Sequence, residues 1–476
     1  MSRRRNPLPI FEKVKVVDIS SQGKAIAKSD DLVIFLENAV PGDLVDIQVT
    51  KKKKNYYEGK VLKYIEYSKD RVEPVCKHFG VCGGCKWQHM GYADQLRHKQ
   101  AWIEQNFKKI GKMELPAVSA ILGSDETEYY RNKLEFAFSN KKWLTHEQML
   151  QLRNETLPEE HEQNGLGLHI PGKFDKVIDL EECHLQAEPS NSIRLAVRNY
   201  ALENKLEFFD IRAQKGLLRN LIIRTTLTGD LMVLLSFYKD NKVQINGLME
   251  YLIEQFPQIS SLMYVINPKK NDTILDLDIK IYHGKGNIMD VIGDLKFNIG
   301  PKTFFQTNTK QASALYKVVA EYAELTGTEL VYDLYTGSGT IANYLAKDAK
   351  KVLGIESVPE AIEDAKANSL LNKISNTEFL AGDLKDVLND DLIAIQGNPD
   401  VIVTDPPRAG MHEDVVKCIM KIAPEKIIYV SCNSATQARD ISLMADQYKI
   451  EKMQPVDMFP HTHHVENIAL LLKKKQ

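Results

Sequence analysis

The feature that most constrains the fold is a regular alternation of short apolar strands and helices in the last third of the chain. Strands are predicted at 330–335, 351–356, 376–381, 400–405, 426–431 and 468–473, with helices at 339–348, 359–372, 412–422 and 434–447. Alternation of this kind predicts a doubly wound, mostly parallel sheet. Because such sheets bind ligands at the carboxyl ends of their strands, polar residues just after each strand are the first candidates for a functional site.

Cys432 directly follows the apolar segment Lys426–Val430, which would deliver its thiol to this edge of the sheet. The preceding strand ends in the polar, proline-stiffened turn Asp405–Arg408, a place where a cofactor or substrate is often held. A structural cysteine usually lies within an apolar run, whereas this one stands just beyond it. We therefore interpret Cys432 as a nucleophile.

A glycine-containing loop, Asp333–Thr340, follows the first strand of this region. Glycines let the backbone approach a ligand closely, and the next helix offers free amide groups. Glu356 ends the second strand, where its carboxylate could accept both hydroxyls of a ribose, and Asp383 could reach an adenine amino group. S-adenosylmethionine fits these three points. An empty structural loop is the alternative.

Glu466 lies just before the last predicted strand, in the segment His461–Asn467. The topology brings this segment toward the same edge of the sheet, so Glu466 is either a general base or a solvent-facing carboxylate. His461, His463 and His464 have no spaced partner that would complete a metal site, and a solvated turn is predicted for them.

The first part of the chain shows a different pattern. Short alternating strands within residues 8–68, separated by turn residues, predict a small closed barrel of the oligonucleotide-binding type. The first 100 residues hold 19 Lys and Arg against 12 Asp and Glu, whereas the whole chain has a net charge of -2. The run Lys51–Lys54 is followed by Tyr56 and Tyr57, and a basic loop beside aromatic residues favours single-stranded nucleic acid.

Three of the six cysteines, Cys76, Cys82 and Cys85, lie within ten residues. In a reducing compartment this spacing indicates metal ligation and not disulfides. Cys183, the remaining cysteine outside the doubly wound region, would supply a fourth sulfur. A [4Fe–4S] cluster is favoured over zinc because there is no second Cys-x-x-Cys pair.

Between these regions, residues 115–290 read as mostly strands with some helices, and residues 146–164 as a hydrophilic surface insertion. No apolar run is long enough to span a bilayer, and no signal segment follows the first residues. We expect a cytoplasmic protein with no membrane association. No feature indicates an obligate protein partner.

Taken together, the chain resembles the RNA uracil-C5 methyltransferases from end to end. The motifs that carry the resemblance are Tyr130–Lys133, Phe304–Asn308, Asp405–Gly410, Val430–Asn433 and His464–Glu466. The resemblance implies a multidomain α/β protein. It has an OB-like TRAM β-barrel at 1–69, a central α+β iron–sulfur domain at 70–300 and a Rossmann-like class I methyltransferase domain at 301–476.

The resemblance also implies the chemistry: methyl transfer from S-adenosylmethionine to C5 of a uridine in RNA, ribosomal RNA being favoured and transfer RNA possible. Cys432 would be the nucleophile and Glu466 the base. The residues implied to bind S-adenosylmethionine are Gln306, Tyr335, Glu356, Asp383 and Asp405. Cys76, Cys82, Cys85 and Cys183 would hold the [4Fe–4S] cluster.

Two other functions are weighed against this one. An amino-group methyltransferase also places Asp-Pro-Pro after this strand, but an aromatic residue usually follows, where Arg408 stands here, and it needs no thiol. A non-enzymatic RNA-binding factor on the same fold would have no need for Cys432, Glu466, Glu356 and Asp405 together.

Overall fold

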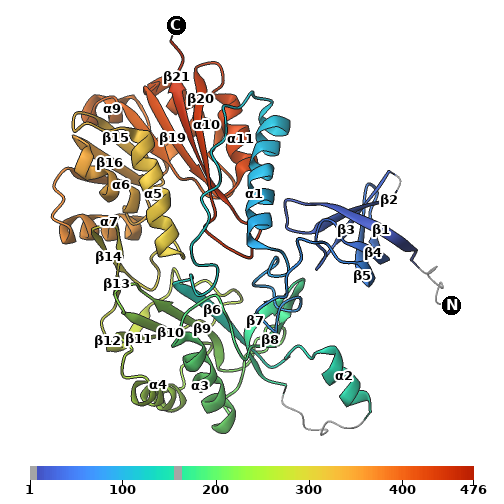
Figure 1. The fold of residues 1–476 in the computed structure, drawn as a ribbon. Coiled ribbons are helices and arrows are strands. Elements are labelled where there is room, and N and C mark those ends of the chain that lie inside the picture. Colours follow the sequence, from blue (N-terminus) through green and yellow to red (C-terminus); the bar gives the residue numbers. More distant parts are fainter. Residues whose placement is uncertain (1–7, 30, 155–162, 476) are drawn as a thin grey trace. The chain divides into compact units, whose positions relative to one another are not determined.

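A computed structural model of the chain describes residues 8–29, 31–154 and 163–475 (Figure 1). The chain divides into two compact units. The first holds Met1–Trp102 and Phe459–His464, and the second holds Ile103–Met458 and Val465–Gln476. The predicted division at 1–69, 70–300 and 301–476 is finer and stays a prediction.

The first unit contains the predicted barrel. Five strands close on themselves in the order β1-β2-β3-β5-β4. They are β1 (Ile10–Ile19), β2 (Ala25–Ser29), β3 (Leu32–Leu36), β4 (Leu44–Lys52) and β5 (Tyr57–Glu66). Alternate residues such as Val14, Val16, Val45 and Ile47 fill the barrel, as the period of two along a strand requires. The cysteine segment follows the barrel and leads into α1 (Tyr92–Asn106).

The second unit begins with a seven-stranded sheet in the order β12-β11-β10-β9-β6-β7-β8. Its strands are β6 (Lys133–Ser139), β7 (Gly165–Ile170), β8 (Lys173–Asp179), β9 (Leu218–Thr225), β10 (Leu231–Phe237), β11 (Ser261–Ile266) and β12 (Ile279–Gly284). Every residue of β10 is buried, because this strand lies inside the sheet and under helices α3 (Ser190–Glu203) and α4 (Lys242–Gln255). We call this the central sheet.

The rest of the second unit is the predicted doubly wound sheet, here called the catalytic sheet, in the order β17-β16-β15-β18-β19-β21-β20. Its strands are β15 (Leu330–Leu334), β16 (Lys351–Glu356), β17 (Thr377–Ala381), β18 (Val401–Thr404), β19 (Lys426–Ser431), β20 (Tyr448–Val456) and β21 (Glu466–Lys473). The first five strands are parallel, and β21 and β20 are antiparallel to their neighbours.

The helices of the catalytic sheet contact one another in two groups. One group is α5 (Thr309–Ala323), α6 (Thr340–Leu345) and α7 (Pro359–Leu371), and the other is α8 (Leu384–Val387), α10 (Glu413–Ile422) and α11 (Ser434–Leu443). A short helix, α9 (Asp390–Gln396), precedes β18. The hairpin β13 (Ile288–Ile292) and β14 (Leu295–Ile299) joins the central region to α5. The layered α/β architecture expected for residues 301–476 is thus confirmed.

Two segments differ from the sequence expectations. The sequence predicts no strand between 447 and 468, yet β20 occupies Tyr448–Val456 at the edge of the catalytic sheet. The segment 146–164, expected as a surface insertion, begins with helix α2 (His146–Arg153), and its residues 155–162 lie outside the described part. Within the described part of the chain, no helix has the length and apolar character needed to cross a membrane.

Candidate active site

The carboxyl edge of the catalytic sheet gathers the residues that follow its central strands. In the parallel register, Leu334 pairs with Thr404, and Thr404 pairs with Tyr429. The loops that begin at Tyr335 and Asp405 therefore leave the sheet side by side, next to the strand that ends before Cys432. This is the edge where ligands bind in open α/β sheets.

Cys432 and Glu466 lie opposite each other at the end of an antiparallel pair. The last pair between β19 and β21 joins Ser431 to Asn467. One step further along the two chains stand Cys432 and Glu466. Residues directly opposite in an antiparallel pair have Cβ atoms about 5 Å apart, so this register explains how residues 34 positions apart in sequence face one another.

The charges of Asp405 and Arg408 shift the pKa of both Cys432 and Glu466. Burial raises the pKa of the Cys432 thiol to about 11, and the nearby carboxyl groups of Glu466 and Asp405 add to the rise, while Arg408 opposes it. Burial likewise raises the pKa of Asp405 and of Glu466, and the charge of Asp405 raises that of Glu466 further. Two buried carboxyl groups this close cannot both ionise easily, so they hold a proton in common near neutral pH.

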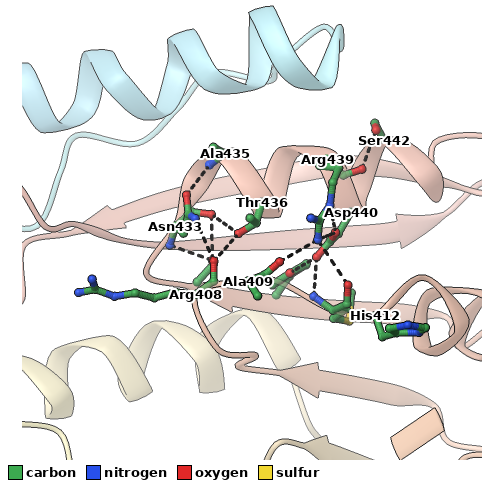
Figure 2. A network of polar contacts seen from close by, with 12 residues as sticks. Arg408, Ala409, His412, Asn433, Ala435, Thr436, Arg439, Asp440 and Ser442 are labelled. Carbon is green, nitrogen blue, oxygen red and sulfur yellow. Dashed lines mark hydrogen bonds and ion pairs between the residues drawn. The ribbon is translucent and has the colours of Figure 1, made fainter. Parts of the chain in front are cut away.

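The loop that carries Arg408 is held by helix α11, which begins two residues after Cys432. Asn433 caps α11 and donates from Nδ2 to the Arg408 carbonyl at 2.9 Å, and Thr436 donates to the same oxygen at 3.3 Å. Figure 2 shows the Arg408 side chain extending away from this network. The main chain of Arg408 is therefore anchored, while its guanidinium is left to face the site.

Asp440 holds the far end of the same loop. Its carboxylate accepts from the Met411 amide at 2.8 Å, from the Tyr429 hydroxyl at 2.6 Å and from Arg439 at 2.6 Å (Figure 2). Gly410 has φ +80, and a Cβ added there would lie 2.6 Å from Asp440 and from Arg439. The Asp-Pro-Pro-Arg-Ala-Gly motif thus needs its glycine for both conformation and space.

The loop Tyr335–Gly339, which follows β15, carries backbone strain. Tyr335, directly after β15, has φ 62, a left-handed conformation that is rare for a bulky residue. Gly337 has φ +55, and no heavy atom lies within 4 Å of where its Cβ would be. Strained residues of this kind cluster at ligand sites. The backbone at Gly337 is open to close approach by a ligand.

Glu356, the last residue of the neighbouring strand β16, accepts a hydrogen bond from this loop. Its Oε2 accepts from the Gly337 amide at 3.2 Å, and its Oε1 accepts from the amides of Ser357 at 2.7 Å and Val358 at 3.1 Å. Each carboxylate oxygen has further lone pairs that could accept a hydroxyl group. This set of donors fixes the orientation of the Glu356 carboxylate.

The other residues expected to bind the cofactor lie at the rim. Asp383 caps α8, and its pKa is lowered by Lys385, whose ammonium lies 3.2 Å away. Gln306 is nearly buried, and its carbonyl accepts from Nδ2 of Asn132 at 2.8 Å. No role was expected from the sequence for Asn132, Asn433 or Asp440. Asn132 and Asn433 lie inside quoted motifs, but Asp440 in mid-helix carried no signal.

The described structure shows no metal site at the four cysteines that were expected to form one. Among the described residues, no group of three or more His, Cys, Asp or Glu side chains is arranged to hold a metal ion. Cys76, Cys82 and Cys85 belong to the first unit, and Cys183 to the second. The Gly84 amide donates to Cys82 Sγ at 3.4 Å, and Gln88 Nε2 donates to Cys85 Sγ at 3.5 Å. The iron–sulfur cluster stays a prediction.

The histidine segment is more ordered than a solvated turn. The His461 carbonyl accepts from the amides of Lys86 at 2.8 Å and Trp87 at 3.0 Å, and Gln95 Oε1 accepts from the His461 amide at 2.9 Å. The prediction of a solvated turn is therefore wrong for His461, because its backbone is tied to the cysteine segment of the same unit.

Comparison with known proteins identifies the family. Residues 211–475 match the model of the tRNA (uracil-5-)-methyltransferases, and residues 12–62 match the TRAM domain. The chain belongs to the tRNA (uracil-5-)-methyltransferase family. It is accordingly an RNA methyltransferase, and its N-terminal barrel is a TRAM domain. The resemblance stated from the sequence motifs is confirmed, and neither alternative function is supported.

Relatives match over nearly the full chain. An RNA methyltransferase of Bacteroides thetaiotaomicron is 53% identical over 95% of this chain and 99% of its own length. One of Porphyromonas gingivalis is 52% identical over 97% of this chain and 100% of its own. Among solved structures, the Pyrococcus abyssi tRNA (uracil-54, C5)-methyltransferase in complex with S-adenosyl-L-homocysteine covers 97% of this chain and 100% of its own. Its TM-score is 0.74 at 27% identity.

Proposed function

We propose that this enzyme transfers a methyl group from S-adenosylmethionine to C5 of a uridine in RNA through a covalent bond between Cys432 and C6. The observation that carries the proposal is the strand register that sets Cys432 opposite Glu466, with Asp405 and Arg408 acting on both. A thiol, a base and a cation at one sheet edge are the groups that this reaction needs.

The reaction begins at the pyrimidine ring, whose C5 is too weak a nucleophile to take a methyl group unaided. The Cys432 sulfur loses its proton and bonds to C6, and the electrons of the C5–C6 double bond move toward O4. Arg408 is placed to stabilise the negative charge that develops on the ring. Bound S-adenosylmethionine supplies the methyl group, which C5 takes from its sulfonium sulfur.

Glu466 completes the reaction. Its carboxylate takes the remaining proton from C5, the C5–C6 double bond re-forms, and the bond between C6 and the Cys432 sulfur breaks. The raised pKa of the Asp405 and Glu466 carboxyl groups makes their ionised form a stronger base than an ordinary carboxylate. A buried thiol cannot reach a stacked base, so the target uridine must be unpaired or flipped out.

The residues at the edge fit S-adenosylmethionine. Glu356 is oriented to accept ribose hydroxyls, the open backbone at Gly337 admits a close ligand, and ionised Asp383 can accept from an adenine amino group. Tyr335 directly follows β15 at this edge, and Ser338 donates to the Phe304 carbonyl, two residues before Gln306, at 3.4 Å. The solved Pyrococcus abyssi relative holds S-adenosyl-L-homocysteine, which supports this assignment.

The RNA is proposed to be ribosomal, with transfer RNA as the alternative. The name of the Pyrococcus abyssi enzyme favours transfer RNA. Mass spectrometry of both RNA classes from cells with and without the gene separates the two, because only the true substrate loses 5-methyluridine.

We also propose that Cys76, Cys82, Cys85 and Cys183 hold a [4Fe–4S] cluster with a folding role. Support comes from the amide donors on Cys82 and Cys85, since N–H groups commonly donate to cluster sulfurs. Iron and sulfide analysis of anaerobically purified protein tests this. Loss of iron in Cys82→Ser but not in Cys418→Ser is expected. Iron-free wild-type protein that is fully folded would refute the cluster.

The covalent step is tested with RNA that carries 5-fluorouridine. Fluorine at C5 cannot leave as a proton does, so the methylated adduct should persist as a protein–RNA band on a denaturing gel. Cys432→Ala should form no band and show no turnover, whereas the control Cys418→Ala, in α10, should behave as wild type. An adduct in Cys432→Ala would disprove the assigned nucleophile.

A further inference from the structure

Two cations face each other on the central sheet. Lys133 of β6 pairs directly with Arg224 of β9 in the antiparallel register. Side chains at such positions leave the same face of the sheet with Cβ atoms about 5 Å apart, and like charges placed there destabilise the pair. Arg224 is 4% exposed and Lys133 is half-buried, so water screens this repulsion poorly.

Neither cation forms an ion pair with a carboxylate in the described part of the chain. Among the described residues, no Asp or Glu lies within ion-pair distance of Lys133 or Arg224. Arg224 donates from one terminal nitrogen to the Thr303 carbonyl at 2.7 Å, and its Nε is buried without a hydrogen-bond partner in the described structure. Glu135, two residues along β6, is the one carboxyl group whose charge raises the pKa of Lys133.

Burial lowers the pKa of both groups, to about 10 for Arg224, and the Arg224 charge lowers that of Lys133 further. Buried charges are normally paired or hydrogen-bonded. Glu135 acts on Lys133 without forming an ion pair with either cation, so the facing pair Lys133 and Arg224 can still take an anion.

The pair lies beside the segment that reaches the active site. Arg224 holds the carbonyl of Thr303, and Asn132, the residue before Lys133, holds the carbonyl of Gln306 at 2.8 Å. The Asn132 amide also donates to the Thr307 carbonyl at 2.8 Å. Both strands thus contact the short stretch that carries Gln306, one of the proposed cofactor residues.

We propose that Lys133 and Arg224 form an anion site that takes a backbone phosphate of the substrate RNA close to the target uridine. The site deepens the proposed function and rests on RNA being the substrate. A phosphodiester brings the negative charge that this pair lacks, and an arginine with a lysine is a common phosphate-binding pair. The Tyr130–Lys133 motif thereby gains a role.

The carboxylate of the methionine part of the cofactor is a second source of the same negative charge. The two sources differ in what they do to affinity. A phosphate contact contributes to RNA binding and to its salt dependence, about 0.7–0.9 in the slope of log affinity against log salt. A carboxylate contact contributes to cofactor binding alone.

The test compares Lys133→Met with Lys133→Arg, which keeps the charge. Lys280→Met, on β12 of the same sheet, is the matched control. Binding of a fluorescein-labelled oligouridylate is measured by anisotropy over a series of KCl concentrations, and S-adenosylmethionine binding by calorimetry. Arg224 is left unchanged because its contact with Thr303 is structural.

Lys133→Met is expected to weaken oligouridylate binding about 10-fold and to reduce the salt slope by about one, with Lys133→Arg and Lys280→Met close to wild type. Cofactor binding should be unchanged in all three. An unchanged RNA affinity and slope in a folded Lys133→Met protein would overturn the proposal, as would a loss confined to cofactor binding. RNA and cofactor binding need no turnover, so a failed methylation assay would refute the proposed function and leave this result standing.

Discussion

The two seven-stranded sheets of the second unit differ in the sign of most of their buried charges. The catalytic sheet buries acids at and beyond its strand ends, among them Asp333, Asp440 and Glu466. The central sheet buries bases in and beside its strands, among them Arg194, Arg219 and Arg224. Both sheets have apolar cores, so the difference lies in the function of the charged residues.

Asp333, Asp405 and Glu466 at the catalytic sheet have raised pKa values, whereas Arg194 and Arg224 at the central sheet have lowered ones. Burial raises the pKa of Asp333 to about 7 and lowers that of Arg194 to about 10. Each sheet therefore holds charges that a ligand of the opposite sign would stabilise. A sulfonium cofactor suits the first sheet and a phosphate backbone the second. We expect proton chemistry to depend on the acids and RNA affinity on the bases.

The largest expected effect is on turnover. Glu466→Gln keeps the shape of the side chain but cannot take a proton from C5, so methylation should fall by at least ~1,000-fold. The covalent adduct with ordinary RNA should accumulate, because its release needs that proton transfer. Denaturing gels measure the adduct, and Glu360→Gln on α7 is the control. Normal turnover in Glu466→Gln would show that Glu466 is not the base that takes the proton from C5.

The second effect concerns the thiol among these acids. With a pKa of about 11, Cys432 should react with iodoacetamide at neutral pH a few hundred-fold more slowly than a free cysteine of pKa about 8.5. The rate should rise about tenfold per pH unit without levelling off below pH about 10. Mass spectrometry of the Cys432 peptide measures it. A plateau near pH 7 would contradict the raised pKa that burial and the nearby carboxyl groups give this thiol.

The third effect tests a base of the central sheet. Arg219 donates to the carbonyls of Asn267 and Lys269 and to Asp272, and its guanidinium lies 4.4 Å from the Phe209 ring centre. Arg219→Met should lower the free energy of unfolding by about 3 kcal/mol, because it leaves buried acceptors without a donor. Chemical denaturation measures this.

Arg212→Met is the matched control for that prediction. Arg212 pairs with Asp175, but its own side chain is largely exposed, so water screens its charge and its loss should change stability little. An equal decrease in the free energy of unfolding in the two variants would show that buried Arg219 stabilises the protein no more than exposed Arg212 does.

The smallest effect is a pH-dependent gain in stability. The folded-state pKa of Asp405 lies above its unfolded value, so wild-type stability falls as pH rises from about 4 through the raised pKa. Asp405→Asn escapes this loss, and its melting temperature at pH 8 should exceed that of wild type by roughly 2–4 °C. At pH 4 the two should match. A variant that is less stable at pH 8 would contradict the raised pKa.

The sequence predicted the barrel and most of the catalytic sheet, because strand periodicity and strand–helix alternation are local properties. It missed β20, whose Lys449, Glu451 and Lys452 resemble the end of a helix but belong to an edge strand, where charges are tolerated. Asp405 and Glu466 were each recognised by motif. Their electrostatic coupling was not, because it depends on a strand order that no local pattern encodes.

The anchoring residues were the hardest to predict. Asp440 lies in the middle of α11, where a carboxylate would ordinarily be taken as a solvent-facing residue, yet it is 1% exposed and accepts hydrogen bonds from Met411, Tyr429 and Arg439. Its role arises from the loop that folds over it. Tertiary hydrogen bonds of this kind leave no spacing signature in a sequence.

The position of β21 between β19 and β20 has a consequence for assembly during synthesis. Until β21 emerges from the ribosome, β19 presents an unpaired apolar edge, and the thiol at its end has no opposing carboxylate. A nascent chain at this stage is thus inactive, and its exposed strand edge can pair with other chains and aggregate. We expect chaperones to bind the nascent chain until β21 pairs with β19. The enzyme would become active only at that late step.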